Sequence, residues 1–266
     1  MTVTTETVTY RTVDGRTFSG STFINPAAMT RLTQSTTGFL GKLGDLTRKN
    51  AYNATTAGAT IQGQYINGPL YVNAPNVTVA DCFLDATNAY WGIEVGPLAT
   101  GLVVKDTTTV FGASCGIMDD NQTPDVTFLR LSVTGGTDGI KLTGSKRLVQ
   151  GCFIGALTKT ATSHNDCIQA SSGDHWRILG NTMECNDTGC VSIFEGQGTW
   201  DTILIQGNYL TGGGYPLYLG GKSATNVQVL GNVISGWGYG PYTDWPPASG
   251  TNVFSGNTDT TCNPIK

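Results

Sequence analysis

Apolar-X-apolar triplets recur along most of the chain and define its organisation. From about residue 57 onward the triplets are Leu70-Tyr71-Val72, Ile93-Glu94-Val95, Ile117-Met118-Asp119, Ile140-Lys141-Leu142, Ile168-Gln169-Ala170, Val191-Ser192-Ile193 and Leu217-Tyr218-Leu219. Apolar residues at every second position are typical of strands that are buried on one side. Each triplet therefore predicts a short strand whose middle side chain points away from the core.

A second column of related positions falls between the triplets. It holds Gln64, Cys82, Leu131, Cys152, Asn181, Asn208 and Asn232, with Thr107 and Asn257 fitting more loosely. Successive members lie 18 to 29 residues apart, which gives about nine rungs with a period near 24. Short strands separated by Gly and Asn turns at this period indicate a solenoid, because a propeller blade needs about 40–50 residues.

This repeat predicts an all-β fold, a single-stranded right-handed parallel β-helix of about nine rungs over residues 57–258. Parallel strands stack about 4.8 Å apart, so that equivalent positions lie above one another. Asn181, Asn208 and Asn232 are then expected to form an inward ladder in which each amide bonds the next. Residues 259–266 are expected to form a C-terminal tail.

Residues 1–56 lack the repeat and are assigned to an N-terminal cap or attachment segment. Asn25-Pro26 is typical of a helix start. Apolar residues then recur at helical spacing, although three glycines weaken the pattern: Met29, Leu32, Phe39, Leu40, Leu43 and Leu46. We expect a short N-terminal helical cap that covers the open end of the β-helix.

Composition and charge exclude several classes of partner. A net charge of -4 without a basic stripe argues against nucleic acid. The sequence contains no run of about 18 apolar residues, so we expect no membrane span. The seven cysteines lack the spacing of a metal site. We therefore expect no metal and no cofactor, with calcium at Glu195 as the one alternative.

The outward positions of the triplets are predicted to form one stripe. Its members are Tyr71, Glu94, Met118, Lys141, Gln169, Ser192 and Tyr218. The turns that lead into these strands add Trp91, Asp138, His164, Asp166 and Tyr215. The charged and aromatic members span about four rungs, or roughly 15–20 Å, at the spacing of stacked strands. Such a length suits an extended polymer better than a small molecule.

Five residues are candidates for chemistry. His164 precedes Asp166 by two residues in the longest repeat, where a carboxylate can raise the basicity of an imidazole. Asp138 occupies the corresponding place one rung earlier, so two carboxylates about 5 Å apart are expected, as in retaining sugar hydrolysis. The alternative is that both acids only begin turns. Lys141 is either a base or a solubilising surface residue, and Glu195 is a general acid, a calcium ligand or an ordinary loop residue.

Ligand binding is assigned to the aromatic and polar members of the same stripe. Trp91, Tyr215 and Tyr218 can stack on sugar rings through their apolar faces. Glu94 and Gln169 lie beside them as polar contacts. Aromatic outer faces are also found where such helices pack together, so a homotrimer is an open alternative.

Three stretches resemble a known group of proteins: TDGIKLTG from Thr137, SHNDCIQASSG from Ser163, and VSIFEGQGTWDTILIQGNYLTGGGYPLYLG from Val191. They are similar to right-handed parallel β-helix proteins of the pectate-lyase-like superfamily, especially tail proteins of actinobacterial phages and secreted bacterial proteins. The family usually shows His-x-Asp-Gly-Ile-Gln at the second stretch. Here His164, Asp166 and Gln169 match, while Cys167 replaces the glycine.

The resemblance implies a fold and a range of activities, because members include lyases, hydrolases and non-catalytic binders. We expect a phage tail protein of the virion, made in the host cytoplasm, that binds and depolymerises a host cell-surface polysaccharide. Its other partners would be further virion tail proteins. The alternatives are a non-catalytic structural or adhesive β-helix and a secreted bacterial polysaccharide lyase.

Overall fold

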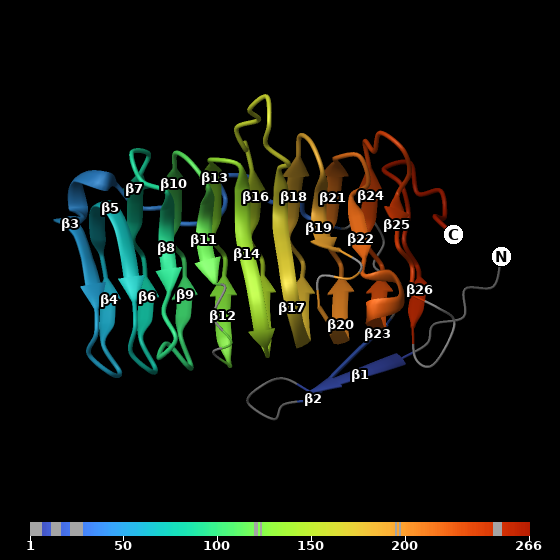
Figure 1. The fold of residues 1–266 in the computed structure, drawn as a ribbon, viewed down its shortest axis with the longest axis horizontal. Coiled ribbons are helices and arrows are strands. Elements are labelled where there is room, and N and C mark those ends of the chain that lie inside the picture. Colours follow the sequence, from blue (N-terminus) through green and yellow to red (C-terminus); the bar gives the residue numbers. More distant parts are fainter. Residues whose placement is uncertain are drawn as a thin grey trace.

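The computed structural model is one long parallel β-solenoid whose strands stack from the blue end to the red end in Figure 1. The structure describes residues 29–119, 122, 124–194, 196, 198–246 and 252–266. It also describes the backbone of an antiparallel hairpin formed by β1 (Thr7–Arg11) and β2 (Thr17–Ser21). The predicted all-β parallel solenoid is therefore confirmed.

Three faces make up the solenoid, and every strand pairs in parallel with its equivalents one rung away. The first face holds β4 (Thr60–Gln62), β6 (Thr78–Ala80), β9 (Val103–Lys105), β12 (Val126–Leu129), β15 (Arg147–Gln150), the end of β17 (Asp166–Leu179), β20 (Trp200–Gln206), β23 (Ala224–Leu230) and β26 (Val253–Ser255). The second face holds the start of β5 (Gln64–Val72), β7 (Phe83–Ala86), β10 (Thr108–Phe111), β13 (Ser132–Gly135), β16 (Phe153–Gly155), β18 (Thr182–Cys185), β21 (Tyr209–Gly212) and β24 (Val233–Ser235). The third face holds the end of β3 (Thr47–Ala54), the end of β5, β8 (Trp91–Val95), β11 (Cys115–Asp119), β14 (Asp138–Ser145), the start of β17, β19 (Gly189–Ile193), β22 (Leu217–Leu219) and β25 (Tyr242–Thr243).

The solenoid has about seven turns, so the prediction of nine rungs was wrong. Complete turns of three strands run from β6-β7-β8 to β23-β24-β25. The repeat also counted the two ends, where β5 crosses two faces as one continuous strand and β26 lies alone on the first face. Parallel pairing begins with β3 at Thr47, before the start that the repeat indicated at residue 57.

Stacked apolar side chains fill the interior. Ile140, Ile168, Val191 and Leu217 follow one another in register along the third face, and each has no exposed surface. Burial of each such side chain contributes about 1.5–3 kcal/mol, so the column is a main source of stability.

The predicted asparagine ladder is present. The side-chain Nδ2 of Asn181 donates to Oδ1 of Asn208 at 2.9 Å, Asn208 donates likewise to Asn232, and Asn232 to Asn257. Each Oδ1 also accepts the backbone N–H of the asparagine one rung earlier. The ladder therefore satisfies buried polar groups at the turns, where the strand hydrogen bonds are interrupted.

The predicted N-terminal helix is absent from residues 29–46, which hold only one 3-10 turn, Leu43–Asp45. This segment runs instead as an extended strap along the second face, visible as the blue trace behind the strands in Figure 1. Arg31 pairs with Glu184 at 2.6 Å, and the N–H of Leu32 donates to Thr182. Further along the strap, the N–H of Phe39 donates to Oγ1 of Thr108.

Glycine explains why the strap is not a helix. Gly38 has a φ of +72°, and an added Cβ would lie 2.3 Å from Oγ1 of Thr108. The N–H of Gly38 donates to the carbonyl of Arg130 rather than to a helical partner. Leu40 and Leu43, which the helical pattern assigned to a buried side, are exposed. Tertiary hydrogen bonds thus override a weak local propensity.

An ion pair is buried where β11 ends. Arg147 Nε lies 2.6 Å from Asp119 Oδ2, and both side chains have no exposed surface. The second guanidinium nitrogen donates to Asp119 Oδ1 at 3.0 Å. Asp119 is therefore a structural residue inside the solenoid and not one of the acids of the outward stripe.

We expect Asp119→Ala to lower the free energy of unfolding by about 3–5 kcal/mol, because it leaves the buried guanidinium of Arg147 without its counter-charge. Chemical denaturation followed by circular dichroism measures this change. The double variant Asp119→Leu/Arg147→Met is the control, since it removes both charges and should recover most of the loss. A single variant as stable as the parent would contradict the structural role.

No helix among the described residues is long and apolar enough to cross a membrane.

Candidate functional site

The outward stripe has the register that the sequence predicts. Adjacent rungs pair Tyr71 with Glu94, Glu94 with Met118, Met118 with Lys141, Lys141 with Gln169, Gln169 with Ser192, and Ser192 with Tyr218. Ser192 is the exception to the outward exposure, because it is fully buried under its neighbours. The stripe runs along the third face, over β5, β8, β11, β14, β17, β19 and β22.

A local change in the alternation places two acids on the same side as the stripe. In β14 and β17 two consecutive residues are turned inward, Gly139-Ile140 and Cys167-Ile168. A Cβ on Gly139 would lie 2.3 Å from Cγ2 of Ile154, and the buried Cys167 occupies the same inward position one rung later. As a result Asp138 lies beside Lys141, and Asp166 lies beside Gln169.

Asp138 and Asp166 are stacked on adjacent rungs, as predicted. The backbone N–H of Asp166 donates to Asp138 Oδ1 at 3.0 Å. Lys141 Nζ lies 3.2 Å from Asp138 Oδ2. The carboxyl of Asp166 accepts from the hydroxyl of Ser192 and, at 3.2 Å, from Nε2 of Gln169. Each acid is thus held by its own set of partners, and among the described residues the cation Lys141 pairs with Asp138.

Burial gives these two carboxyls unusual titration behaviour. Burial raises the pKa of Asp166 to about 7, and the charge of Asp138 adds to that rise while the Ser192 hydrogen bond opposes it. Burial also raises the pKa of Asp138, but the positive charge of Lys141 counteracts it. Near neutral pH Asp166 therefore exists as both acid and carboxylate. A pKa near neutral pH is typical of a general acid or base.

His164 lies at the exposed rim of this acid pair. The side-chain partners of Asp166 are Ser192 and Gln169, whereas positive charge on His164 lowers the pKa of Asp138 and of Asp187. Asp166 therefore does not orient His164 as expected. The charge of His164 acts instead on the carboxyls of Asp138 and Asp187. Asp187 itself forms an ion pair with Lys159.

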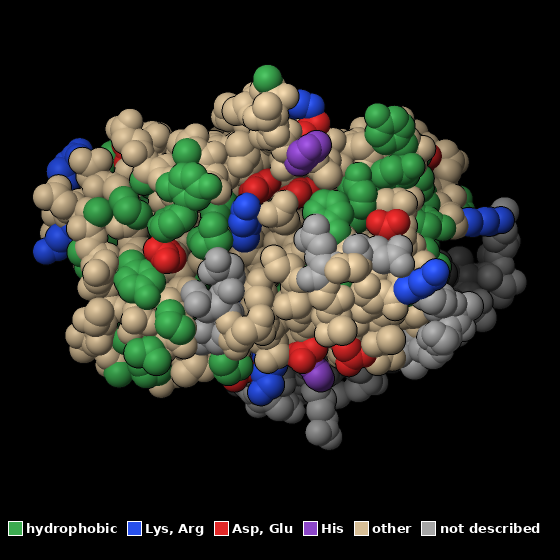
Figure 2. Space-filling model, viewed as in Figure 1, with side chains coloured by type: hydrophobic (Ala, Val, Ile, Leu, Met, Phe, Trp, Pro, Cys, Tyr) green, Lys and Arg blue, Asp and Glu red, His purple; other side chains and the backbone are tan. Residues whose placement is uncertain are grey.

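Aromatic rings flank the acid pair on one side. Tyr218 packs against Tyr215 with ring centroids 5.7 Å apart and against Phe194 at 5.0 Å. Tyr215 also contacts the exposed Tyr239. Figure 2 shows hydrophobic side chains on both sides of a central group of acidic, basic and histidine side chains on this face. Hydrophobic side chains therefore border the charged group on this surface.

The remaining predicted residues are less close to the acid pair. Trp91 stacks in register below Cys115, which in turn lies below Asp138, and its ring contacts Tyr90. Glu94 belongs to the same distant part of the stripe. Glu195 lies outside the described residues. Within the described ranges, no group of three or more His, Cys, Asp or Glu side chains is arranged to hold a metal ion.

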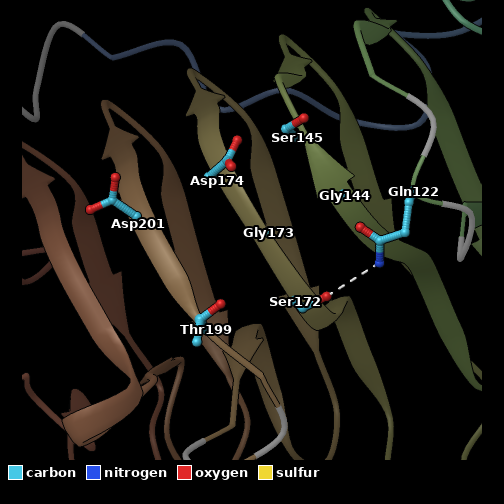
Figure 3. Close-up of a pocket in the computed structure, with 8 residues that line it drawn as sticks. All are labelled: Gln122, Gly144, Ser145, Ser172, Gly173, Asp174, Thr199 and Asp201. Atoms are coloured by element: carbon cyan, nitrogen blue, oxygen red, sulfur yellow. Dashed lines mark hydrogen bonds between the residues drawn. The ribbon is translucent and has the colours of Figure 1, made fainter.

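A polar cavity of about 220 Å³ lies beside the end of β14 and the middle of β17. Figure 3 shows its lining: Gln122, Gly144, Ser145, Ser172, Gly173, Asp174, Thr199 and Asp201. Asp174 stacks on Asp201 and bonds Nδ1 of the exposed His175 at 3.0 Å. Sequence reasoning missed these residues. The stacking of Ser145, Asp174 and Asp201 follows only from the length of β17, which carries the chain across two faces without a turn.

No protein-family model, no curated protein and no solved structure matches this chain. The comparisons therefore assign no family, and the three motif stretches carry a resemblance alone.

Proposed function

We propose that the outward stripe binds a polysaccharide of a bacterial cell surface and that Asp138 and Asp166 cleave it. The observation that carries this proposal is the stacked acid pair, in which Asp138 is held by Lys141 and Asp166 by Ser192 and Gln169. The pair lies near the middle of a stripe that extends over several rungs.

Polymer binding is supported by the shape and chemistry of the stripe. Stacked strands repeat about every 4.8 Å, so the stripe offers a straight row of side chains along which several sugar units can lie. The rings of Tyr215 and Tyr218 present apolar faces for stacking, and Gln169 presents an amide for hydroxyl groups. These groups lie next to the acid pair, where a bound chain would have to be positioned for cleavage.

The acid pair supports a retaining hydrolysis. Carboxyls on adjacent strands are separated by about one strand spacing, close to the roughly 5 Å of retaining enzymes and shorter than an inverting pair requires. Asp166 in its protonated form would donate its proton to the glycosidic oxygen as the bond from that oxygen to C1 breaks. Asp138, kept charged by Lys141, would attack C1 and form an ester.

The second step restores the site. Asp166, now a carboxylate, would take a proton from water, and the water oxygen would displace Asp138 from C1. The amide of Gln169 lies over Asp166 and must turn aside for either step, so substrate binding is expected to move it. His164 at the rim would add positive charge beside Asp138 when protonated.

A non-catalytic binding protein is the second candidate, and one observation favours it. Asp166 and Ser192 have no exposed surface in this structure. A buried carboxyl that is held by a serine and a glutamine can also serve only to fix the start of β17. In that case the stripe would be an adhesive surface without turnover.

The test is incubation of the full chain with a panel of bacterial envelope polysaccharides, followed by assays of reducing ends and of binding by affinity electrophoresis. Binding together with new reducing ends supports cleavage. Binding without turnover across the panel supports the adhesive alternative. Absence of binding to every polymer would overturn both candidates.

Tyr218→Ala is expected to weaken polysaccharide binding about tenfold, or about 1.4 kcal/mol, because the apolar face that stacks on the sugar is lost. Tyr218→Phe retains the ring and should bind within about threefold of the parent. Affinity electrophoresis of the three proteins on one polymer measures both changes. Unchanged binding by the alanine variant would remove Tyr218 from the binding surface.

The setting that we propose for this activity is the tail of a phage, with other tail proteins as partners. The support is the resemblance of the stretch from Ser163 to phage tail proteins. Mass spectrometry of purified virions that encode this chain tests the setting. Recovery of the chain only from the medium of a bacterial culture without virions would favour the secreted alternative.

A further inference from the structure

We propose that the polymer bound by this stripe is an uncharged polysaccharide, and that its cleavage is hydrolysis and not elimination. This inference rests on the function proposed above and names its substrate class. It follows from the charges that the described residues place around the acid pair.

The lysines at this site are neutralised by the acids of the protein itself. Asp138 and Asp166 lie at its centre, Asp187 lies at its rim beside Asn165, and Glu94 lies further along the stripe. The two lysines that border the acids are already paired, Lys141 with Asp138 and Lys159 with Asp187. A polymer that carries carboxylates or phosphates would therefore find no unpaired lysine among the described residues of this site to offset its charge.

Elimination makes a stronger demand on positive charge than binding does. In that reaction a base removes the C5 proton of a uronate, the bond between C4 and its glycosidic oxygen breaks, and a C4–C5 double bond forms. Negative charge builds up on the uronate carboxylate before the leaving group departs, and cationic groups must stabilise it. Lys141, the cation closest to the acid pair, is held by Asp138, so its charge already neutralises the protein's own carboxylate.

An uncharged sugar chain fits the same groups well. Ionised carboxylates only accept hydrogen bonds, and sugar hydroxyls can donate them. The amide of Gln169 can donate and accept, and the rings of Tyr215 and Tyr218 suit the apolar faces of sugar rings. Hydrolysis needs one acid and one carboxylate at the cleaved bond, which the stacked pair supplies. The site therefore has the donors, acceptors and rings for a neutral polymer.

The experiment separates a bacterial envelope polysaccharide into neutral and anionic fractions by anion exchange and offers both to the full chain. The anionic fraction is also tested after chemical reduction of its carboxyl groups, which gives a matched polymer without charge. We expect at least tenfold tighter binding to the neutral fraction, and a gain in binding by the anionic fraction after reduction. We also expect reducing ends without absorbance near 235 nm. Binding to the neutral fraction should hardly change between about 0.05 and 0.5 M salt, because no charged pair is screened.

Glu94→Lys provides a variant with the opposite charge on the stripe. It should increase binding of the anionic fraction at low salt, and salt should reverse the gain. Tighter binding of the anionic fraction by the parent protein, or products that absorb near 235 nm, would overturn this inference and leave the proposed polysaccharide function standing. Absence of binding to every fraction would instead overturn the proposed function itself.

Discussion

Asp166→Asn is expected to reduce kcat for polysaccharide cleavage by about a thousandfold, because the loss of a general acid typically costs a factor of 10² to 10⁴. The amide keeps the shape of the carboxyl and can still accept the hydrogen bond from Ser192. Binding of the polymer should stay within about threefold of the parent, since the aromatic rings and Gln169 remain. Reducing-end assays and affinity electrophoresis on the same protein separate the two effects.

Asp166→Asn lowers kcat, but it should raise the free energy of unfolding at high pH. The pKa of Asp166 is raised from 3.8 in the unfolded chain to about 7 in the folded protein, so the folded state favours the protonated acid. The stability that this proton contributes is present below pH 4 and is lost as pH rises through 7. The amide of the asparagine variant does not titrate in this pH range, so the variant does not lose this stability. It should therefore unfold at higher denaturant concentration than the parent at pH 8, and with a smaller difference at pH 5.

Ser192→Ala is the control for this pair of measurements, because it removes a bonding partner of Asp166 and leaves the carboxyl in place. Loss of the serine hydroxyl should raise the pKa of Asp166 further, and the decline of stability should move to higher pH. Turnover by Asp166→Asn at the rate of the parent would exclude the acid role. Equal pH dependence of stability in the parent and the asparagine variant would show that the carboxyl titrates as it does in the unfolded chain.

Asn208→Leu is expected to lower the free energy of unfolding by several kcal/mol, because it removes four buried hydrogen bonds and a buried polar group left unsatisfied costs about 1–3 kcal/mol. The backbone N–H and the Nδ2 of Asn181 lose their common acceptor, and the carbonyl of Ile178 loses the Nδ2 of Asn208. Denaturant unfolding followed by circular dichroism measures the loss. A change in the slope of the transition would indicate that the rungs on either side of the substitution unfold separately.

The chain contains its own comparison for this substitution. Leu131 occupies the same column two rungs below the ladder, where the neighbouring residue is Cys152 and no amide depends on it. Leucine is therefore tolerated in the column and becomes costly only where an amide lies on each side. Asn67→Leu, on the exposed surface of β5, should change stability by less than about 0.5 kcal/mol. An Asn208→Leu variant as stable as Asn67→Leu would contradict any contribution from the ladder.

Periodicity made the repeating part of this molecule predictable. In stacked parallel strands a residue has the same surroundings as its equivalents in neighbouring rungs, so one column of the alignment describes many positions at once. The asparagine ladder, the order of the stripe from Tyr71 to Tyr218 and the stacking of Asp138 below Asp166 all follow from that rule. Each is a statement about register, and register follows from the period.

Contacts that occur only once were not predictable in this way. The strap from Arg31 to Phe39 is held by single hydrogen bonds to distant rungs, and its apolar spacing indicated a helix instead. The burial of Asp119 depends on Arg147, which is 28 residues away and belongs to another face. His175 and Asp174 are close to Asp201 because β17 continues across two faces. No local pattern carries information of that kind.

The course of the strap also determines the order in which this chain can fold. Arg31 contacts Glu184 and lies over the ring of Tyr209, so its docking surface includes residues that leave the ribosome long after it does. Rungs up to β21 must be formed before the strap can be held in place. We therefore expect the solenoid to assemble with its early segment undocked and with the outer side of the second face uncovered, and to close that face in one of its last folding steps.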